Sequence, residues 1–472
     1  MKKIFALILF ISLAINTFSQ KLTISPPVNI RNDNSFEVIR INNSPVVLRY
    51  NNNEFILDIF DQNLTNFSEK KILFEKRNSE IVSTSANDNN LLVFYSYEHK
   101  GDELIKVVKI NENGTKSDSA EIYKASSSID SYDFKNTESE DGSKTVLFRS
   151  INSTEMDFII FDNFRFKKLY SKRIKFKELK TNTDFRKIEI SNDGEVFVIF
   201  QKLPGIFNKY NNKIIINKID PNDQNLKKKE LDVEFYFDNF KIVCDNKNRH
   251  LIIAGTRNKL FQNKSEGYFT IKLNSELELL YIRNNPFSKG ILEMYYKTMK
   301  SKNYINNLKV KEIIPRNDGG FVLSLEKVEI ITRQSNNDFR MRYQSYVEST
   351  DNIYGEIILI SVHENGDEFW ARMISKNQVS SNDEGIYSSF GHLITPGRIN
   401  IVFNDEIKDE TQVIMYNINP VGNIERISLF NTELYDLKLL LRESIQLSNK
   451  NLLIPSYNKD KLKIVMLELV TN

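Results

Sequence analysis

The sequence predicts an all-β fold, a single β-propeller, on three observations. Helical periodicity is nearly absent, and short runs rich in Ile, Val, Phe and Tyr recur, separated by Asn, Asp and Gly. These runs form one repeated unit: an alternating strand, two strongly apolar strands and a more polar strand. The unit recurs eight times, which matches the roughly four to eight four-stranded antiparallel blades of propellers. A β-sandwich would lack this regular count, and a β-helix would have a much shorter period.

The second strand of each unit is its clearest marker. It is apolar and usually follows a tight-turn signal such as Asn192-Asp193-Gly194, whose residues tolerate the positive φ that hairpin turns require. The eight second strands are expected at 46–50, 91–95, 145–148, 196–200, 251–254, 321–325, 399–403 and 452–454. The first unit is the least clear, because 51–53 could open a second strand instead of a third, so seven blades is the alternative.

The ends of the chain predict how the ring closes. The third strand of the eighth unit ends at Leu469, so that unit lacks a fourth strand of its own. A spare strand is available at 22–30, before the first unit begins near Phe36. We therefore expect the N-terminal strand to pair with 461–469 and complete the last blade, which would remove two open sheet edges.

Two features resemble those of known propellers. Asp141-Gly142 and Ser191-Asn192-Asp193-Gly194 resemble the Ser-x-Asp-Gly turns of propellers in periplasmic Tol-type and peptidase-associated proteins. The segment 354–389 is similar to a stretch common among uncharacterised exported bacterial propeller proteins, on the residues Gly366, Trp370, Lys376, Gln378, Asp383, Gly385 and Tyr387. This resemblance to the β-propeller superfamily covers one unit closely and the others by architecture. It implies the fold and no known activity.

Residues 1–19 have the layout of a secretory signal peptide. Lys2 and Lys3 precede an apolar stretch at 4–15, and Thr17 and Ser19 place small residues before a cleavage site at Gln20. The stretch is shorter than the roughly 20 residues of a spanning helix, although a retained anchor is the alternative. We expect a propeller domain at 20–472, no transmembrane segment after signal removal, and a periplasmic or secreted protein.

The charge and the cysteine content argue against a nucleic-acid-binding protein and against a fold held by internal disulfides. The formal net charge is +3, and it falls to +1 without Lys2 and Lys3, so no strong field attracts nucleic acid. The single cysteine, Cys244, excludes an internal disulfide and lies in an apolar run, which favours a buried structural role. Trp370, the only tryptophan, is expected to pack between blades rather than stack on a sugar.

No catalytic or metal-binding pattern stands out. The four histidines fall in different units at no ligand spacing, and 220–225 is better explained as a turn than as a calcium loop. The sequence has no Gly-x-Ser-x-Gly elbow and no phosphate-binding glycine loop. We therefore predict no cofactor, no metal and no identifiable catalytic residue. Whether the protein is an enzyme stays open, and the sequence favours a protein that is not.

Long connections suggest where binding occurs. The longest segments are 202–212, 257–266, 284–306, 327–353 and 375–387. Each joins a second to a third strand or one unit to the next, so strand alternation places all five on one face, where we expect them around the central channel. Arg and Tyr are common anchors of interfaces. The candidate binding residues chosen from these segments are Arg257, Arg340, Arg342, Tyr343, Asp383 and Tyr387.

These observations predict an exported, non-catalytic binding or scaffold propeller that recognises a protein or glycan partner in the cell envelope through its long-loop face. The alternative is an exported carbohydrate-active enzyme, a glycoside hydrolase or lyase, with carboxylates in the central funnel. Two acids from different blades directed into one pocket, about 5–10 Å apart, would favour the enzyme.

Overall fold

The computed structural model describes the chain from Ser19 to Val470. The described part omits 51–53, 77–78, 88–89, 127–132, 204–211, 222–225, 260–261, 297–301, 337–345 and 408–410. The predicted signal peptide therefore lies outside the described residues, apart from Ser19. None of the helices in the described part has the length and apolar character needed to cross a membrane.

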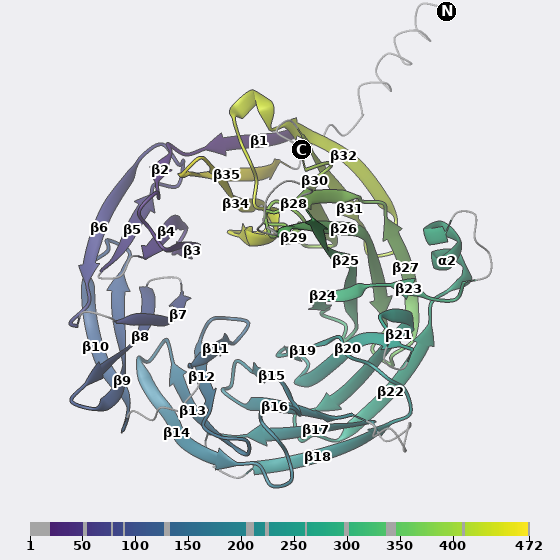
Figure 1. The fold of residues 1–472 in the computed structure, drawn as a ribbon, viewed down its shortest axis with the longest axis horizontal. Coiled ribbons are helices and arrows are strands. Elements are labelled where there is room, and N and C mark those ends of the chain that lie inside the picture. Colours follow the sequence, from purple (N-terminus) through teal and green to yellow (C-terminus); the bar gives the residue numbers. More distant parts are fainter. Residues whose placement is uncertain are drawn as a thin grey trace, which may run out of the picture.

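Eight antiparallel sheets stand around a central axis and form an eight-bladed β-propeller (Figure 1). This confirms the fold prediction and excludes the alternative of seven blades. One strand of each sheet lies next to the axis. These innermost strands are β3 (Ser35–Ile41), β7 (Glu80–Ala86), β11 (Lys135–Glu138), β15 (Phe185–Ile190), β19 (Phe240–Asp245), β24 (Leu308–Pro315), β29 (Gly391–Thr395) and β33 (Ile445–Gln446).

The second and third strands of each blade form the core, because both of their faces pack against neighbouring blades. The second strands are β4 (Ser44–Tyr50), β8 (Asn90–His99), β12 (Lys144–Ser150), β16 (Val196–Lys202), β20 (His250–Asn258), β25 (Phe321–Asn336), β30 (Arg398–Asn404) and β34 (Asn451–Asn458). The third strands are β5 (Glu54–Phe60), β9 (Asp102–Asn111), β13 (Glu155–Asp162), β17 (Asn212–Ile219), β21 (Lys264–Asn274), β26 (Tyr346–Val362), β31 (Gln412–Ile418) and β35 (Lys461–Val470). All eight expected second strands are confirmed.

The fourth strands form the outer wall and are more polar. They are β6 (Phe67–Leu73), β10 (Lys116–Ser126), β14 (Lys167–Lys175), β18 (Leu226–Val233), β22 (Leu279–Pro286), β27 (Glu368–Ile374), β32 (Ile424–Asn431) and, in the eighth blade, β1 (Ser19–Ile24). Shorter elements lie in the connections: β2 (Val28–Asn29), α2 (Lys289–Tyr296), β23 (Ile305–Asn306), β28 (Gln378–Ser381), η1 (Glu433–Tyr435) and η2 (Leu441–Glu443).

The N-terminal strand closes the ring as the sequence predicts. β1 pairs antiparallel with β35 from Ser19 opposite Val470 to Ile24 opposite Val465, and β2 continues along the same strand. Ser25 joins the two pairings, because its backbone N–H donates to the Ile464 carbonyl at 2.9 Å and its hydroxyl accepts from the Ile464 N–H at 2.8 Å. The eighth blade is therefore built from both ends of the chain.

Trp370 and Cys244 have the structural roles that the sequence predicts. Trp370 is 7% exposed and packs in the apolar cluster between the sixth and seventh blades, where its indole N–H donates to the Pro420 carbonyl. Cys244 is buried in the cluster between the fourth and fifth blades, and burial raises the pKa of its thiol. Both side chains join neighbouring blades, which are otherwise separate sheets.

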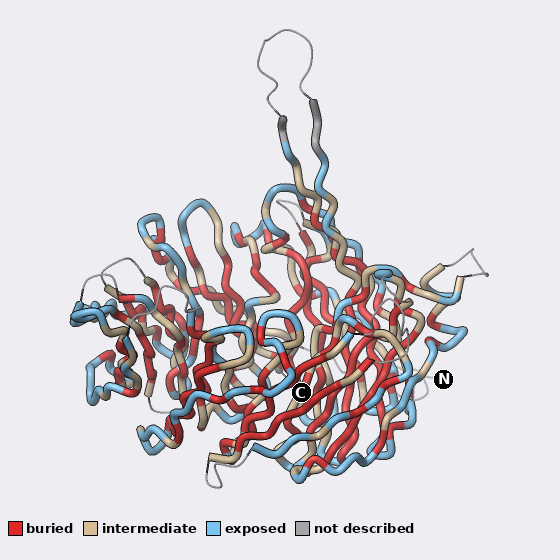
Figure 2. Tube along the Cα trace, turned by 60° about the horizontal axis from the view of Figure 1, so that its bottom comes forward, coloured by how far each residue is buried: buried red, intermediate tan, exposed pale blue. Residues whose placement is uncertain are grey.

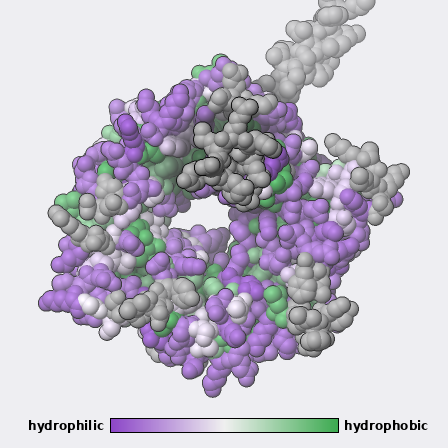
Figure 3. Space-filling view, viewed as in Figure 1, coloured by the Kyte–Doolittle hydropathy of each residue, from purple (hydrophilic) through white to green (hydrophobic). Residues whose placement is uncertain are grey.

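Strand alternation places the described ends of the five long connections on one face, while most of 202–212 lies outside the described residues. Two of the expectations need correction. The segment 327–353 is not a loop in its described part: β25 and β26 continue as an antiparallel ribbon to the Asn336–Tyr346 pair, and this ribbon projects from the ring (Figure 2). The 284–306 connection carries α2 to the outer rim instead of toward the channel (Figure 1). Figure 3 views this long-loop face and shows an opening at the centre of the ring.

Candidate functional site

The structure brings together two of the six residues predicted to bind a partner. Asp383 and Tyr387 line one pocket. Arg257 lies in the fifth blade and is not part of that pocket. Its guanidinium donates to the Asn284 side chain and the Glu266 carbonyl, both at 3.3 Å. The other three predicted residues, Arg340, Arg342 and Tyr343, lie outside the described residues.

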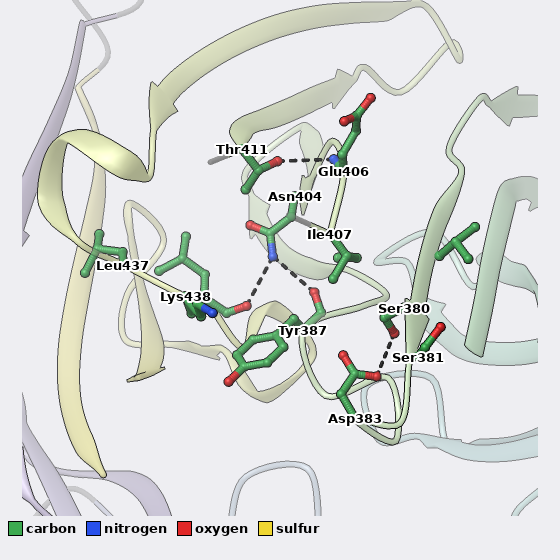
Figure 4. A pocket seen from close by; sticks show the side chains of 12 residues that line it. Ser380, Ser381, Asp383, Tyr387, Asn404, Glu406, Ile407, Thr411, Leu437 and Lys438 are labelled. Atoms are coloured by element: carbon green, nitrogen blue, oxygen red, sulfur yellow. Dashed lines mark hydrogen bonds between the residues drawn. The ribbon is translucent and has the colours of Figure 1, made fainter. Parts of the chain in front are cut away.

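The pocket containing Asp383 and Tyr387 has a volume of about 420 Å³ and lies on the long-loop face, where blades six, seven and eight meet (Figure 4). Its walls come from the 375–387 connection, the end of β30 with the loop after it, and the link between β32 and β33. The lining residues are Val379, Ser380, Ser381, Asp383, Tyr387, Asn404, Glu406, Ile407, Thr411, Leu437, Lys438 and Leu439. This volume falls in the range of small-molecule sites, roughly 300–1,000 Å³.

Asp383 holds the turn that follows β28. Its Oδ1 atom accepts from the Ser380 hydroxyl at 2.7 Å, the Gly385 N–H at 2.9 Å and the Asn352 amide at 3.4 Å. Gly385 has a φ of +65°, and a Cβ atom there would lie 2.7 Å from the Tyr354 ring, so only glycine fits. The Asp and Gly of this segment therefore shape one wall of the pocket.

Asn404 and Tyr387 form the floor. The Asn404 amide donates to the carbonyls of Tyr387 at 3.1 Å and Leu439 at 3.2 Å, which ties two pocket walls together. Asn404 is 3% exposed, and its Oδ1 atom is buried without a hydrogen-bond partner among the described residues. The Tyr387 hydroxyl donates to the Tyr457 carbonyl at 3.2 Å, and burial raises the pKa of this phenol.

Gln378 holds the 375–387 connection in place through three hydrogen bonds. Its Oε1 atom accepts from the Lys376 amine at 3.0 Å and the Ser389 N–H at 2.7 Å, and its amide donates to the Asn404 carbonyl at 2.6 Å. Ser389 has a φ of +76°, a conformation that costs a non-glycine residue roughly 1–3 kcal/mol. The bonds around Gln378 hold this strained residue in place, so the connection is ordered at both ends.

A buried ion pair lies beneath the same connection. The Lys376 amine is 2.9 Å from Glu326 Oε1, and both side chains are 0% exposed. Glu326 Oε2 accepts from the Ser389 hydroxyl at 2.8 Å and lies 3.3 Å from the Lys311 amine. Burial lowers the pKa of the Lys376 amine, and the charge of Glu326 opposes that shift. The buried Lys376–Glu326 pair therefore ties the 375–387 connection to β25.

Sequence reasoning missed a larger cavity, of about 620 Å³, on the opposite face between the sixth and seventh blades. Three short turns and nearby strand ends form it, and its lining includes Trp370 and the exposed side chains of Phe369 and Val421. Each turn contributes only a few residues, so no long segment marks this cavity in the sequence. The signal available was the Phe369–Trp370 pair, two adjacent large aromatic residues on a fourth strand.

Acidic side chains on the innermost strands form a second group of interest. Burial raises the pKa of Glu138 on β11 and of Glu189 on β15 to about 7. The charge of Glu37 on β3 raises the pKa of Glu138 further, so carboxyl groups of the first and third blades influence each other. Among the described residues, no group of three His, Cys, Asp or Glu side chains could hold a metal ion.

These two acids predict a pH-dependent stability. The pKa values of these two acids in the folded chain are about 7, above the ordinary glutamate value of 4.5, so the chain takes up protons when it folds between pH 4.5 and 7. The folded protein therefore loses stability as the pH rises from 4.5 to 7. We expect Glu138→Gln and Glu189→Gln each to stabilise the protein above pH 7 by roughly 2 kcal/mol, with the gain shrinking as pH falls and vanishing below about pH 4.5. Urea unfolding at several pH values measures this. Glu121→Gln, at an exposed site, is the control, and a pH-independent difference for Glu138→Gln would contradict the prediction.

Comparisons with known proteins assign neither a family nor an activity to this chain. Neither a known family model nor a curated protein matches the sequence. Among solved structures, the chain is similar to the oligogalacturonate lyase in complex with manganese (8% identity, 97% of this chain and 99% of that one, TM-score 0.41). It is also similar to the uncharacterized protein lmo1340 from Listeria monocytogenes EGD-e (9%, 80% and 88%, 0.38) and to Porphyromonas gingivalis dipeptidyl peptidase 4 (10%, 92% and 59%, 0.44). At these TM-scores the likenesses carry no argument about activity.

Proposed function

We propose that this protein is an exported, non-catalytic binding propeller that captures a protein or glycan partner of the cell envelope in the pocket between blades six, seven and eight. Export rests on the signal-peptide layout of residues 1–19. Binding rests chiefly on one observation: the pocket wall at 375–387 is held in place before any ligand arrives. Gln378, the Lys376–Glu326 ion pair and Asp383 all contribute to that order.

Preorganisation matters because ordering side chains and loops opposes binding. Immobilising each flexible side chain costs roughly 0.5–1.5 kcal/mol when a ligand binds. A wall that is already ordered avoids most of this cost, so a modest set of contacts is enough for useful affinity. Buried networks that only stabilised the fold would not need to converge on one surface connection, as these do at 376–389.

The test compares bulky substitutions on the two faces. Ser381 and Asn317 are both exposed, and they line the long-loop pocket and the opposite cavity, respectively. Immobilised wild type, Ser381→Trp and Asn317→Trp are incubated with protein and glycan fractions of the cell envelope. We expect Ser381→Trp to abolish capture and Asn317→Trp to retain it, with both melting within a few degrees of wild type. Capture lost only in Asn317→Trp would move the site to the opposite face and overturn this proposal.

The acids on the innermost strands favour a second candidate function, a carbohydrate-active enzyme. A carboxyl group whose pKa is about 7 is about half protonated at neutral pH and can act as a general acid, and Glu37 supplies a second carboxyl that interacts with Glu138. Polysaccharide cleavage by the wild type that is lost in Glu138→Gln would support this candidate. Cleavage unchanged in that variant would exclude these acids as its catalytic pair.

A further inference from the structure

We propose that the pocket between blades six, seven and eight takes a neutral sugar unit of a glycan. This inference rests on the binding function proposed above and names its ligand class. It follows from three properties of the lining: acceptor oxygens that the described residues leave partly or wholly unbonded, hydroxyl donors, and apolar side chains. Sugars need all three, because each hydroxyl both donates and accepts while the ring carries apolar C–H groups.

Two acceptor oxygens of the lining have bonding capacity left for a ligand. The bonds that Asp383 accepts from described residues all end on Oδ1, and Figure 4 shows its other oxygen turned away from Ser380, on the side of Tyr387. Asn404 Oδ1, near the middle of the group in Figure 4, is buried and has no partner among the described residues. A buried acceptor left unpaired is costly. A ligand hydroxyl that donates to it would satisfy that atom.

The charges of the lining select a neutral ligand. Two acids, Asp383 and Glu406, would repel an acidic sugar such as a uronate. The cation of Lys438 offsets one of these two acids, so little net charge remains to attract a protonated amine. Hydroxyls of Ser380, Ser381 and Thr411 complete a mixed set of donors and acceptors. This mixture suits groups that can both donate and accept, as sugar hydroxyls do.

Apolar side chains provide contacts for the sugar ring. Val379, Ile407, Leu437 and Leu439 belong to the lining, and Tyr387 adds an aromatic ring. Leu437 and Leu439 are buried, whereas Val379 is 48% exposed, so its surface is available to a ligand. A protein partner that relied on this site would have to insert a side chain into the pocket, whereas a terminal or branching sugar has a suitable size.

The test uses an isosteric substitution at Asp383. Asp383→Asn keeps the Oδ1 acceptor that holds the turn and replaces the other oxygen with an amide donor. Affinity is measured by calorimetry for neutral gluco-, galacto-, manno- and xylo-oligosaccharides, for oligogalacturonate and for chitosan oligomers. We expect at least one neutral series to bind and Asp383→Asn to weaken it about tenfold or more. Asp351→Asn is the matched control: Asp351 accepts from Ser381 and pairs with Arg333 but does not line the pocket.

The outcomes separate this inference from the proposed function. Binding restricted to oligogalacturonate or chitosan would overturn the neutral-sugar inference. A second result would also overturn the neutral-sugar inference: no oligosaccharide binds, and the protein captures a protein partner that Ser381→Trp no longer captures. That result would support the proposed binding function. An equal loss in Asp383→Asn and Asp351→Asn would also overturn the inference, because it would show a general effect of charge. Capture insensitive to Ser381→Trp would defeat the proposed function itself.

Discussion

Removing residues 1–30, so that the chain begins at Arg31, is expected to lower the thermal midpoint by on the order of 10 °C. The deletion takes away β1 and β2, which together form the outer strand of the eighth blade. β35 would then present a row of unpaired backbone groups at an open edge. The ring would also lose its only covalently continuous link between its first and last blades.

Side-chain burial accounts for the size of the effect. Val28 and Ile30 are buried in the cluster that joins the eighth and first blades, and Leu22 and Ile24 pack on the adjacent cluster. Full burial of one such side chain contributes roughly 1.5–3 kcal/mol, so the four together contribute several kcal/mol. A loss of that size is a large fraction of the roughly 5–15 kcal/mol that stabilises typical folded proteins.

A synthetic peptide provides the control for this deletion. Residues 19–30 added in trans should restore much of the lost midpoint, whereas a peptide with Ser in place of Leu22 and Ile24 should not. Differential scanning calorimetry reads both. A shortened chain that melts like the full one would disprove closure by β1. Loss of folding in the shortened chain, with recovery by the native peptide alone, would support it.

Replacing Lys376 with methionine is expected to reduce the free energy of unfolding by about 3 kcal/mol, at the lower end of the range for breaking a buried ion pair. The substitution leaves Glu326 charged and 0% exposed. Lys311 and Ser389 still contact that carboxylate, which limits the loss. Urea unfolding measures the change, and the loosened 375–387 connection should also weaken ligand capture.

A double substitution tests the cause. Lys376→Met with Glu326→Leu removes both charges, so it should recover most of the stability that the single change loses. Lys289→Met is the matched control, because that side chain is 89% exposed and pairs only with Glu293 on the helix surface. A double variant no more stable than Lys376→Met would show that the lysine acts through packing and not through its charge.

The sequence predicted most of the fold because each blade strand can be recognised from its own residues and from the turn beside it. A second strand such as β16 is buried along nearly its whole length and follows a turn at Gly194, so composition and punctuation mark it. The ribbon formed by β25 and β26 has no such signal. Outside the ring, Ile330 is 63% exposed and Arg333 pairs with Asp351 across the strands. The outer part of the β25–β26 ribbon is held by pairing between its two strands and not by burial, so the pattern of apolar residues in the sequence could not reveal it.

The candidate site was less accessible to sequence reasoning. Asp383 and Tyr387 were found because they lie on a long connection. Asn404 was not, because its role depends on the carbonyls of Tyr387 and Leu439 brought beside it from other segments. Lys376 and Glu326 are 50 residues apart, and each resembles an ordinary surface charge until the fold buries them together. Pairing between distant segments is the information that a single sequence lacks.

The closure by β1 also sets an order of events during folding. Ser25 bonds to Ile464 across a separation of 439 residues, so this contact has a high entropic cost while the intervening chain is unfolded. Once the first seven blades have formed, β1 and β35 are already neighbours, so the entropic cost of bringing them together is small. The eighth blade should therefore assemble last, as a slow step governed by topology. Until then β1 stays unpaired and open to association with other chains.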